Sequence, residues 1–282
     1  MDKIEWKWKT SDGLEMYSQA WLPEGKAKGV VCLVHGLGEH SGRYAADGEA
    51  LTGAGYILAG FDLRGFGKSE GILGHTPSLE AYLDDIDLFL AEIAQRYTNL
   101  PRFLYGSSMG GVLVLAYSPL RKPAIAGVIA IAPGLISAIE KQKSKVILAK
   151  VMGRLVPTLS KDSGLETSLL CRDPEMVEDF INDPLVHRRV TTSWALSMFK
   201  AIRIAFENAS SFPSPLLLMH GTKDEIAYPI GSQKFANLAT KDKVMLKMLE
   251  GFMHELHEDP EKAEVFKIMI DWLNTNLVKG NK

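Results

Sequence analysis

A serine with the surroundings of a nucleophile stands near the middle of the chain. The apolar run 103–105 leads into Gly-Ser-Ser-Met-Gly at 106–110, and a helical pattern follows over 111–117. This is the spacing of the nucleophile elbow GxSxG, in which a tight turn between a strand and a helix exposes the central serine, here Ser108. Flanking glycines let the helix and the strand approach closely. We expect Ser108 to be a nucleophile; the alternative is an ordinary strand-to-helix turn.

A serine hydroxyl is a poor nucleophile unless a neighbouring base removes its proton, so an acid and a histidine are needed further along the chain. One later apolar run ends in a loop that carries Asp224, with Glu225 beside it. The next run ends in a loop that carries His254, and His257 follows three residues later. Functional side chains of a parallel sheet follow the carboxyl ends of its strands. We predict His254 as the base and Asp224 as the acid that orients it, with His257 and Glu225 as competitors.

Attack on an ester carbonyl creates an oxyanion, which needs backbone N–H donors. The residue after the nucleophile supplies one, so we assign the amide of Met109 to this role. The loop 35–38, His-Gly-Leu-Gly, follows another apolar run, and the amide of Leu37 is the second candidate. His35 is interpreted as structural, because one base is sufficient. This reaction needs no metal ion and no organic cofactor.

Short apolar runs alternate with helical patterns along most of the chain. The runs are 29–34, 56–61, 103–105, 125–131, 216–219 and 244–249, and the alternating stretches 4–8 and 14–22 predict a hairpin at the N-terminus. Continuous apolar strands separated by helices indicate a mostly parallel sheet with helices on both faces. The sequence therefore predicts the α/β class.

The segment 134–211 interrupts this alternation, because it contains helical patterns and no strand-like run. We interpret it as an inserted helical cap, with a core formed by 1–133 and 212–282. Within the cap, 146–156 and 194–206 are more apolar than exposed helices need to be, so they must pack against the core, a ligand or a bilayer.

Two further patterns concern helices of the core. Over 79–93 the apolar residues recur at helical spacing, and Asp84, Asp85 and Asp87 fall on the other side, where we expect solvent. A last helix is predicted over 261–278, after Pro260.

Composition limits the partners. Lysine plus arginine (32) nearly balances aspartate plus glutamate (34), which leaves no basic footprint for nucleic acid. The two cysteines form no disulfide framework, and Cys32 lies in an apolar run that predicts simple packing. The N-terminus lacks the pattern of a signal peptide, and the longest nearly uncharged stretch, 124–139, is too short to cross a membrane. We expect a cytoplasmic protein, with peripheral membrane contact through the cap as an open option and no expectation for the oligomeric state.

The longer motifs carry a family resemblance. HGLGEHSGRY at 35–44, DLRGFGKSEG at 62–71, the elbow GSSMGG, HGTKDE at 220–225 and GFMHELHEDPE at 251–261 resemble the monoacylglycerol lipase and lysophospholipase branch of the α/β-hydrolases. The likeness covers nearly the whole chain and keeps the motif order. In the cap only NDPL at 182–185 resembles the family.

The resemblance implies an α/β-hydrolase fold, a triad of Ser108, Asp224 and His254, and an oxyanion hole formed by the amides of Leu37 and Met109. It also implies a polar pocket for glycerol at Glu39, Arg43 and His257, although Glu39 and Arg43 can equally form a salt bridge that anchors the loop. Ser107 stands where glycerol-specific animal relatives usually carry histidine, which puts strict monoacylglycerol preference in doubt. We interpret the other charged and polar residues of the second motif, Asp62, Arg64, Ser69 and Glu70, as residues that fix its loop.

The expected function is that of a serine carboxylic-ester hydrolase, a monoacylglycerol lipase or lysophospholipase-like esterase acting on a small lipid ester through an acyl-enzyme. The cap is expected to form an acyl tunnel over Ser108. Activity should fall on acidification near an ordinary histidine pKa of about 6 to 7. The alternatives are a general carboxylesterase, a serine aminopeptidase, which would need an acidic patch for the substrate amine, and a binding module that has lost hydrolysis.

Overall fold

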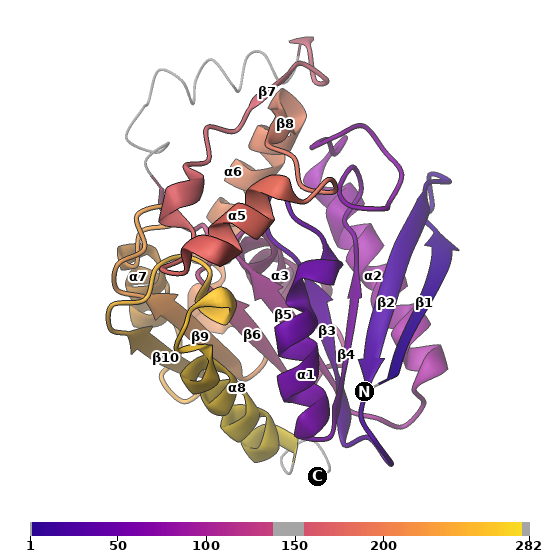
Figure 1. Ribbon diagram of the computed structural model, residues 1–282, viewed down its shortest axis with the longest axis vertical. Coiled ribbons are helices and arrows are strands. Elements are labelled where there is room, and N and C mark those ends of the chain that lie inside the picture. The colour runs from indigo at the N-terminus through magenta and orange to yellow at the C-terminus, as the bar shows by residue number, and fades with distance from the viewer. Residues whose placement is uncertain (1, 138–154, 278–282) are drawn as a thin grey trace.

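The computed structural model describes residues 2–137 and 155–277, and an eight-stranded sheet runs through it (Figure 1). In spatial order the strands are β1 (Asp2–Lys9), β2 (Glu15–Leu22), β4 (Tyr56–Phe61), β3 (Gly29–Val34), β5 (Arg102–Ser107), β6 (Gly127–Ile131), β9 (Leu216–Gly221) and β10 (Val244–Leu249). β1 and β2 form an antiparallel hairpin, β2 is antiparallel to β4, and the strands from β4 to β10 are mutually parallel. The predicted hairpin and the mostly parallel sheet are confirmed.

The register of the parallel strands brings their carboxyl ends to one edge of the sheet. Val34 of β3 lies opposite Gly106 of β5, and Gly221 of β9 lies opposite Leu249 of β10. The loops that follow these strands contain the candidate site residues. The pairing therefore gathers segments from four distant parts of the sequence at the same edge.

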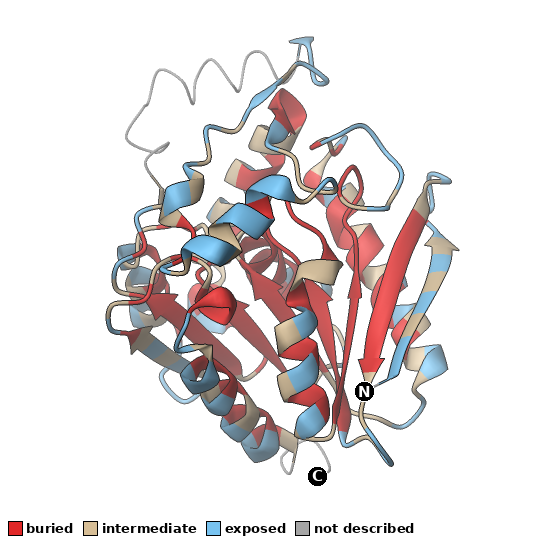
Figure 2. Cartoon of the chain, in the orientation of Figure 1, coloured by how far each residue is buried: buried red, intermediate tan, exposed pale blue. Residues whose placement is uncertain are grey.

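Helices cover both faces of the sheet (Figures 1 and 2). They are α1 (Ala45–Gly53), α2 (Leu79–Arg96), α3 (Met109–Arg121), α5 (Pro174–Asn182), α6 (Thr192–Glu207), α7 (Ile230–Leu238) and α8 (Lys262–Leu277). On β3, Val30 and Cys32 pack in the cluster that includes residues of α2, α3, α6 and α7, whereas Val31 and Leu33 pack in the cluster that includes residues of α1 and α8. The inner strands β3 and β4 are continuously apolar because both of their faces are buried.

Cys32 is fully buried, and burial raises the pKa of its thiol to about 12. It therefore packs as a small hydrophobic residue, as predicted.

The segment between β6 and β9 differs in one respect from the sequence prediction. It contains the helices α5 and α6 and the short 3₁₀ turns η3 (Thr167–Leu169) and η4 (Ala209–Ser211), but also the antiparallel strands β7 (Ser160–Asp162) and β8 (Arg189–Thr191). The prediction of no strand in 134–211 was wrong, because three-residue strands whose residues are polar except for Val190 leave no periodic signal. The buried face of α6 joins the main core, and most of the predicted apolar stretch 146–156 lies outside the described residues.

The helix α2 confirms the predicted helix but corrects one of its faces. Ser78 caps its N-terminus by accepting a hydrogen bond from the Ala81 N–H. Asp84 and Asp87 are partly exposed, but Asp85 is only 1% exposed, because it receives two hydrogen bonds from the Arg64 guanidinium. The expectation of solvent around all three acids was wrong for Asp85.

The remaining predictions concern the C-terminal helix and the membrane. α8 occupies Lys262–Leu277, within the predicted range. Among the described residues, none of the helices has the length and apolar character that crossing a bilayer requires.

Candidate active site

The turn at Ser108 has the geometry that a nucleophile elbow needs. β5 ends at Ser107, α3 begins at Met109, and Ser108 between them has a φ of 51° and a ψ of −113°. A left-handed φ is unusual for a residue with a Cβ, and such strain is held by the surrounding structure. Here the Ser108 N–H donates to the Ile131 carbonyl at 2.9 Å, and the Ser108 carbonyl accepts from Val112 at 3.1 Å. The turn is fixed from both sides.

Two glycines allow the helix and the strands to come this close. A Cβ on Gly106 would lie 2.3 Å from the Gly110 carbonyl oxygen, and a Cβ on Gly110 would lie 1.9 Å from the Val34 carbonyl oxygen. Neither distance is compatible with a side chain. The glycines of the motif are thus required by the crossing of α3 over β5 and β3.

The three predicted triad residues lie in one hydrogen-bonded chain. His254 Nε2 is 2.8 Å from Ser108 Oγ, and His254 Nδ1 is 2.7 Å from Asp224 Oδ2. A carboxylate only accepts, so in neutral His254 the proton lies on Nδ1, and Nε2 accepts from the serine hydroxyl. This is the arrangement in which the imidazole can take the serine proton.

Asp224 is held by contacts that sequence reasoning missed. Its Oδ1 accepts from the N–H groups of Ile226 and Ala227, both at 2.9 Å. Its Oδ2 also accepts from Nε2 of the buried His220 at 3.0 Å, and His220 Nδ1 lies 2.7 Å from Ser232 Oγ. Histidine at the end of a strand could have been noticed as a partner for the acid, but the sequence does not show which way its ring faces. Glu225, the predicted competitor, is exposed.

The charges of the pair stabilise each other. Burial alone would lower the pKa of His254, but the Asp224 carboxylate outweighs burial and raises that pKa to about 9. Burial alone would raise the pKa of Asp224, but the two histidines beside it hold that pKa well below the usual range of a carboxyl. The site therefore favours an ionised Asp224 and stabilises the imidazolium that forms when His254 takes a proton.

The loop after β3 lies next to the serine. The Gly36 N–H donates to Glu39 Oε1, and a Cβ on Gly36 would be 3.2 Å from Ser108 Cβ. Leu37 is the next residue of this loop. The Gly38 carbonyl accepts from the His187 N–H at 3.0 Å, which holds the loop against the segment before β8. The ring of His35 is buried and hydrogen-bonds to the backbone of Gly36 and Leu63, in agreement with a structural role.

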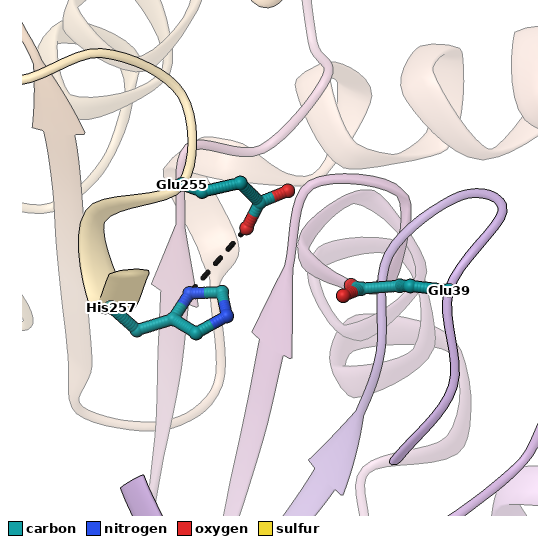
Figure 3. Close-up of side chains that lie close together, drawn as sticks. All are labelled: Glu39, Glu255 and His257. Atoms are coloured by element: carbon teal, nitrogen blue, oxygen red, sulfur yellow. Dashed lines mark ion pairs between the residues drawn. The ribbon is translucent and has the colours of Figure 1, made fainter. Parts of the chain in front are cut away.

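A second polar cluster lies beside the serine, formed by Glu39, Glu255 and His257 (Figure 3). Glu39 accepts from the Tyr44 hydroxyl at 2.7 Å, and the Tyr44 ring stacks on His257 with centroids 4.5 Å apart. Glu255 Oε2 lies 3.5 Å from His257 Nδ1. His257 is 1% exposed, and neither of its ring nitrogens has a hydrogen-bond partner; the same is true of Glu255 Oε2. His257, the predicted competitor for the base, belongs to this cluster, whereas His254 contacts Ser108.

Burial dominates the protonation of this cluster. It lowers the pKa of His257 to about 4, which keeps the imidazole neutral near pH 7. It also raises the pKa of Glu255 to about 8, with the charge of Glu39 adding to the effect. For Glu258, in the 3₁₀ turn η5 (Leu256–Glu258), burial raises the pKa to about 7, although Arg43 acts in the opposite direction. Glu255 could not be singled out from the sequence, because an acid next to a candidate base resembles any surface carboxylate.

Arg43 contacts residues outside the cluster of Glu39, Glu255 and His257. Its guanidinium lies 3.7 Å from both Asp183 and Glu258 and over the Phe180 ring, 5.0 Å from its centroid. Asp183 belongs to the NDPL motif and also accepts from His40 at 2.9 Å. Within residues 2–137 and 155–277, Glu39 is not among the carboxylates within 4.0 Å of Arg43, so the salt bridge considered from the sequence is not formed. Arg43 and His40 instead connect the loop after β3 to the end of α5.

The residues of the second family motif fix their loop, as expected. Asp62 accepts from the N–H groups of Ser41 and Lys68, and the Ser69 hydroxyl donates to the Asp62 carbonyl. Glu70 accepts from the Glu15 N–H at 2.8 Å.

The segment between β6 and β9 approaches Ser108 through Trp194. The indole Nε1 of Trp194, in α6, lies 3.1 Å from the sulfur of Met109. α6 therefore contacts the residue that follows Ser108.

Curated relatives resemble the chain over most of its length. An uncharacterized abhydrolase domain-containing protein of Dictyostelium discoideum is 34% identical over 95% of this chain, which spans 28% of that relative's length. A monoacylglycerol lipase of Mycolicibacterium smegmatis is 29% identical, with 94% of this chain and 95% of the relative covered. The phospholipase YtpA of Bacillus subtilis is 31% identical over 84% of this chain and 92% of its own length.

A solved structure and a family model complete the comparison. The crystal structure of the monoacylglycerol lipase of Paleococcus ferrophilus has a TM-score of 0.83 and 37% identity, and the match covers 98% of this chain and all of that one. The match confirms the α/β-hydrolase fold. The model of the family described as "Serine aminopeptidase, S33" matches residues 25–261. The chain therefore belongs to this hydrolase family of α/β fold.

Proposed function

We propose that this protein is a serine hydrolase that cleaves the carboxylic ester of a singly acylated lipid, a monoacylglycerol or a lysophospholipid. The observation that carries the proposal is the chain of contacts from Ser108 through His254 to Asp224, at 2.8 and 2.7 Å. Relatives named monoacylglycerol lipase and phospholipase support the substrate class.

The reaction follows from this geometry. His254 Nε2 takes the proton of Ser108 as its Oγ attacks the ester carbonyl, and Asp224 stabilises the resulting imidazolium. The tetrahedral oxyanion accepts hydrogen bonds from the amides of Met109, the residue after Ser108, and of Leu37, the residue after Gly36. The imidazolium then protonates the leaving alcohol, and an acyl-enzyme remains. Water attacks that ester with His254 as the base again, and the fatty acid leaves.

In this proposal the alcohol part of the substrate lies in a polar pocket and the acyl chain lies in an apolar one. The polar cluster of Glu39, Glu255 and His257 takes the hydroxyl groups of the alcohol, and Arg43 adds a cation at its border. The acyl chain lies under the cap, for which we propose the bounds 134–211, with Trp194 beside Met109 at its entrance. Glu255 extends the set Glu39, Arg43 and His257 that the resemblance implied.

The test begins with the nucleophile. Ser108→Ala should lower kcat by roughly 10⁴- to 10⁶-fold, as deletions in serine triads do. Retention of most ester hydrolysis would remove Ser108 from the mechanism. A fluorophosphonate should label the wild-type serine, whereas a binding module without hydrolysis would leave it inert. A chain-length series of monoacylglycerols, compared with lysophospholipids and simple esters, then defines the substrate.

A serine aminopeptidase is the second candidate, and the acids beside Ser108 favour it. Glu39 and Glu255 offer carboxyl groups that a substrate ammonium could contact, and the family model carries the description of an aminopeptidase. Turnover of an aminoacyl arylamide, measured beside turnover of a monoacylglycerol, separates the two activities. Faster cleavage of the arylamide would replace the esterase proposal.

We also propose that the protein collects its substrate at a lipid surface through the cap. Leu155, Val156, Leu159 and Ile181 are exposed apolar residues of this region. Co-sedimentation with phosphatidylcholine vesicles should fall when Ile181 is replaced by Ser. Equal sedimentation of the two proteins would contradict the proposal.

A further inference from the structure

The polar cluster beside Ser108 has the donor set of a metal site. Glu39, Glu255 and His257 each offer one ligand atom, and these atoms all lie within 4.8 Å of one another. Figure 3 shows the carboxylates of Glu39 and Glu255 on two sides of the His257 ring. An imidazole with two carboxylates is a donor set that zinc accepts, and three protein ligands leave one position open.

The unpartnered atoms of the cluster point to a ligand. Buried polar atoms in native proteins almost always have hydrogen-bond partners, so exceptions need a reason. Both ring nitrogens of His257 and Oε2 of Glu255 are such exceptions, and His257 is 1% exposed. The His257 ring is held in place by its stacking on Tyr44, 4.5 Å between centroids. A nitrogen that is buried, fixed and without a donor is available to a cation.

The distances between the three ligand atoms are close to those that a tetrahedral zinc site requires. Tetrahedral zinc with bonds of about 2.0 to 2.2 Å places its ligand atoms roughly 3.4 Å apart. His257 Nδ1 and Glu255 Oε2 are already 3.5 Å apart. Glu39 must move its free oxygen closer, while its Oε1 keeps the hydrogen bonds from Gly36 and Tyr44. These two bonds would orient the carboxylate as outer contacts orient metal ligands elsewhere.

The nearby guanidinium of Arg43 does not contact the carboxylates of the cluster. It lies 3.7 Å from Asp183 and from Glu258, and among the described residues neither Glu39 nor Glu255 pairs with it. A divalent ion that binds Glu39 and Glu255 would displace the proton that Glu255, with its raised pKa, retains near neutral pH.

We propose that Glu39, Glu255 and His257 bind one Zn²⁺ ion, and that this ion inhibits hydrolysis by occupying the pocket that would otherwise take the alcohol of the substrate. The binding step is independent of the proposed function, whereas the inhibition rests on it.

The test is calorimetric titration of ZnCl₂ into protein first treated with a chelator and dialysed. Wild-type protein should bind one Zn²⁺ per chain. Glu255→Gln keeps the side-chain volume, and His257→Phe keeps a ring to stack on Tyr44 while removing both nitrogens. Each should weaken binding by about 10-fold or more. His75→Phe removes an imidazole outside the cluster and should leave the dissociation constant unchanged.

Absence of binding in the wild type, or equal affinity in Glu255→Gln, would overturn the inference. Circular dichroism melting of each variant checks that it is folded, and if His257→Phe unfolds, the near-isosteric Glu255→Gln decides alone. Hydrolysis of a soluble ester, with and without Zn²⁺ and chelator, separates the two proposals. Zinc binding at this cluster without esterase activity would contradict the proposed function, and esterase activity without zinc binding would contradict this inference.

Discussion

In the proposed mechanism, the pH dependence of hydrolysis is controlled by one side chain, His254. Acylation requires the neutral imidazole, and the neighbouring Asp224 carboxylate raises the pKa of His254 to about 9. Activity should therefore be lost as the pH falls below that value, and kcat/KM should still rise between pH 7 and 9. The acid limb of the pH–activity profile, where activity falls on acidification, should therefore lie at a higher pH than the ordinary histidine pKa of about 6 to 7 expected from the sequence.

Replacing Asp224 by Asn tests the cause of this shift. Without the carboxylate the acid limb should move down by about one pH unit or more, because the opposite charge is gone. The value of kcat should fall by about 10⁴-fold, as in other triads that lose the orienting acid. Glu225→Gln changes the exposed neighbour and is the matched control, which should keep both the limb and the rate. An unshifted limb in Asp224→Asn would mean that another charge controls His254.

Some residues of the candidate site could be predicted from the sequence and others could not. Ser108, Asp224 and His254 follow strands in loops with recognisable motifs, so their types and positions predicted one site. His220 and Glu255 carry no such mark, because their roles depend on the direction of a buried ring and on the distance to Glu39. Ring direction and the distance between side chains are set by tertiary packing, which the sequence motifs do not show.

At the scale of elements, α2 is attached to the loop after β4 by a buried ion pair. Asp85 accepts from Arg64 at 2.6 and 2.8 Å, and the Arg64 side chain is 4% exposed. Asp85→Ala should lower the free energy of unfolding by about 3 kcal/mol, because a buried guanidinium loses its main partner, although Asp12 remains. Chemical denaturation measures the change.

Asp84, the residue before Asp85, provides the control for this prediction. Asp84 is partly exposed and pairs with Arg121 on the surface, so Asp84→Ala should cost about 1 kcal/mol or less. Similar losses in the two variants would show that burial of Asp85 contributes little.

The crossing of α3 over the sheet leads to a second prediction for elements. Gly110→Ala should destabilise the protein by about 3 kcal/mol or more, because the new methyl group would lie 1.9 Å from a backbone carbonyl that cannot move independently. Gly53→Ala, at the end of α1, meets no atom within 4 Å and should be neutral or stabilising by up to about 1 kcal/mol. Thermal unfolding of the two variants compares them, and equal melting temperatures would refute the prediction.

Elements differ in how well the sequence predicted them. The parallel strands were predictable because burial on two faces requires a continuous apolar run. The helix α2 was predictable because burial of one stripe places apolar residues at helical spacing. β7 and β8 were not predictable, since a strand such as Ser160–Asp162 forms by pairing with its partner strand and has no apolar residues of its own. The direction of Asp85 was likewise decided by Arg64, far away in the sequence.

For the whole molecule, the buried acids predict how stability changes with pH. The pKa of Glu255 is raised to about 8 and that of Glu258 to about 7, so between about pH 5 and 8 the folded state binds more protons than the unfolded state. His254, with its raised pKa, acts in the same direction up to about pH 9. Stability should therefore decrease as the pH rises from 6 to 9.

His257 acts in the opposite direction at lower pH. Its pKa is lowered to about 4, so its contribution to stability is lost as the pH falls from about 6.5 to 4. Between about pH 4.5 and 6.5 this effect opposes only part of the effect of Glu255 and Glu258, so the melting temperature should be highest near pH 4 to 5 and fall by on the order of 5 °C toward pH 9. Glu255→Gln should flatten the alkaline side of this curve. A curve of unchanged slope in the variant would show that Glu255 is not a source of the effect.

The sheet has two edge strands, and the composition of one of them, β1, has a consequence for aggregation. Along β1, exposed residues alternate with half-buried ones, and the exposed positions include Lys3, Lys7 and Lys9. An open strand edge is a template on which another chain can add its own strand and start a fibril, and lysine side chains oppose that addition by charge and by solvation. The alternation that covers the core with Trp6 and Trp8 thus also protects this edge against the growth of intermolecular sheets.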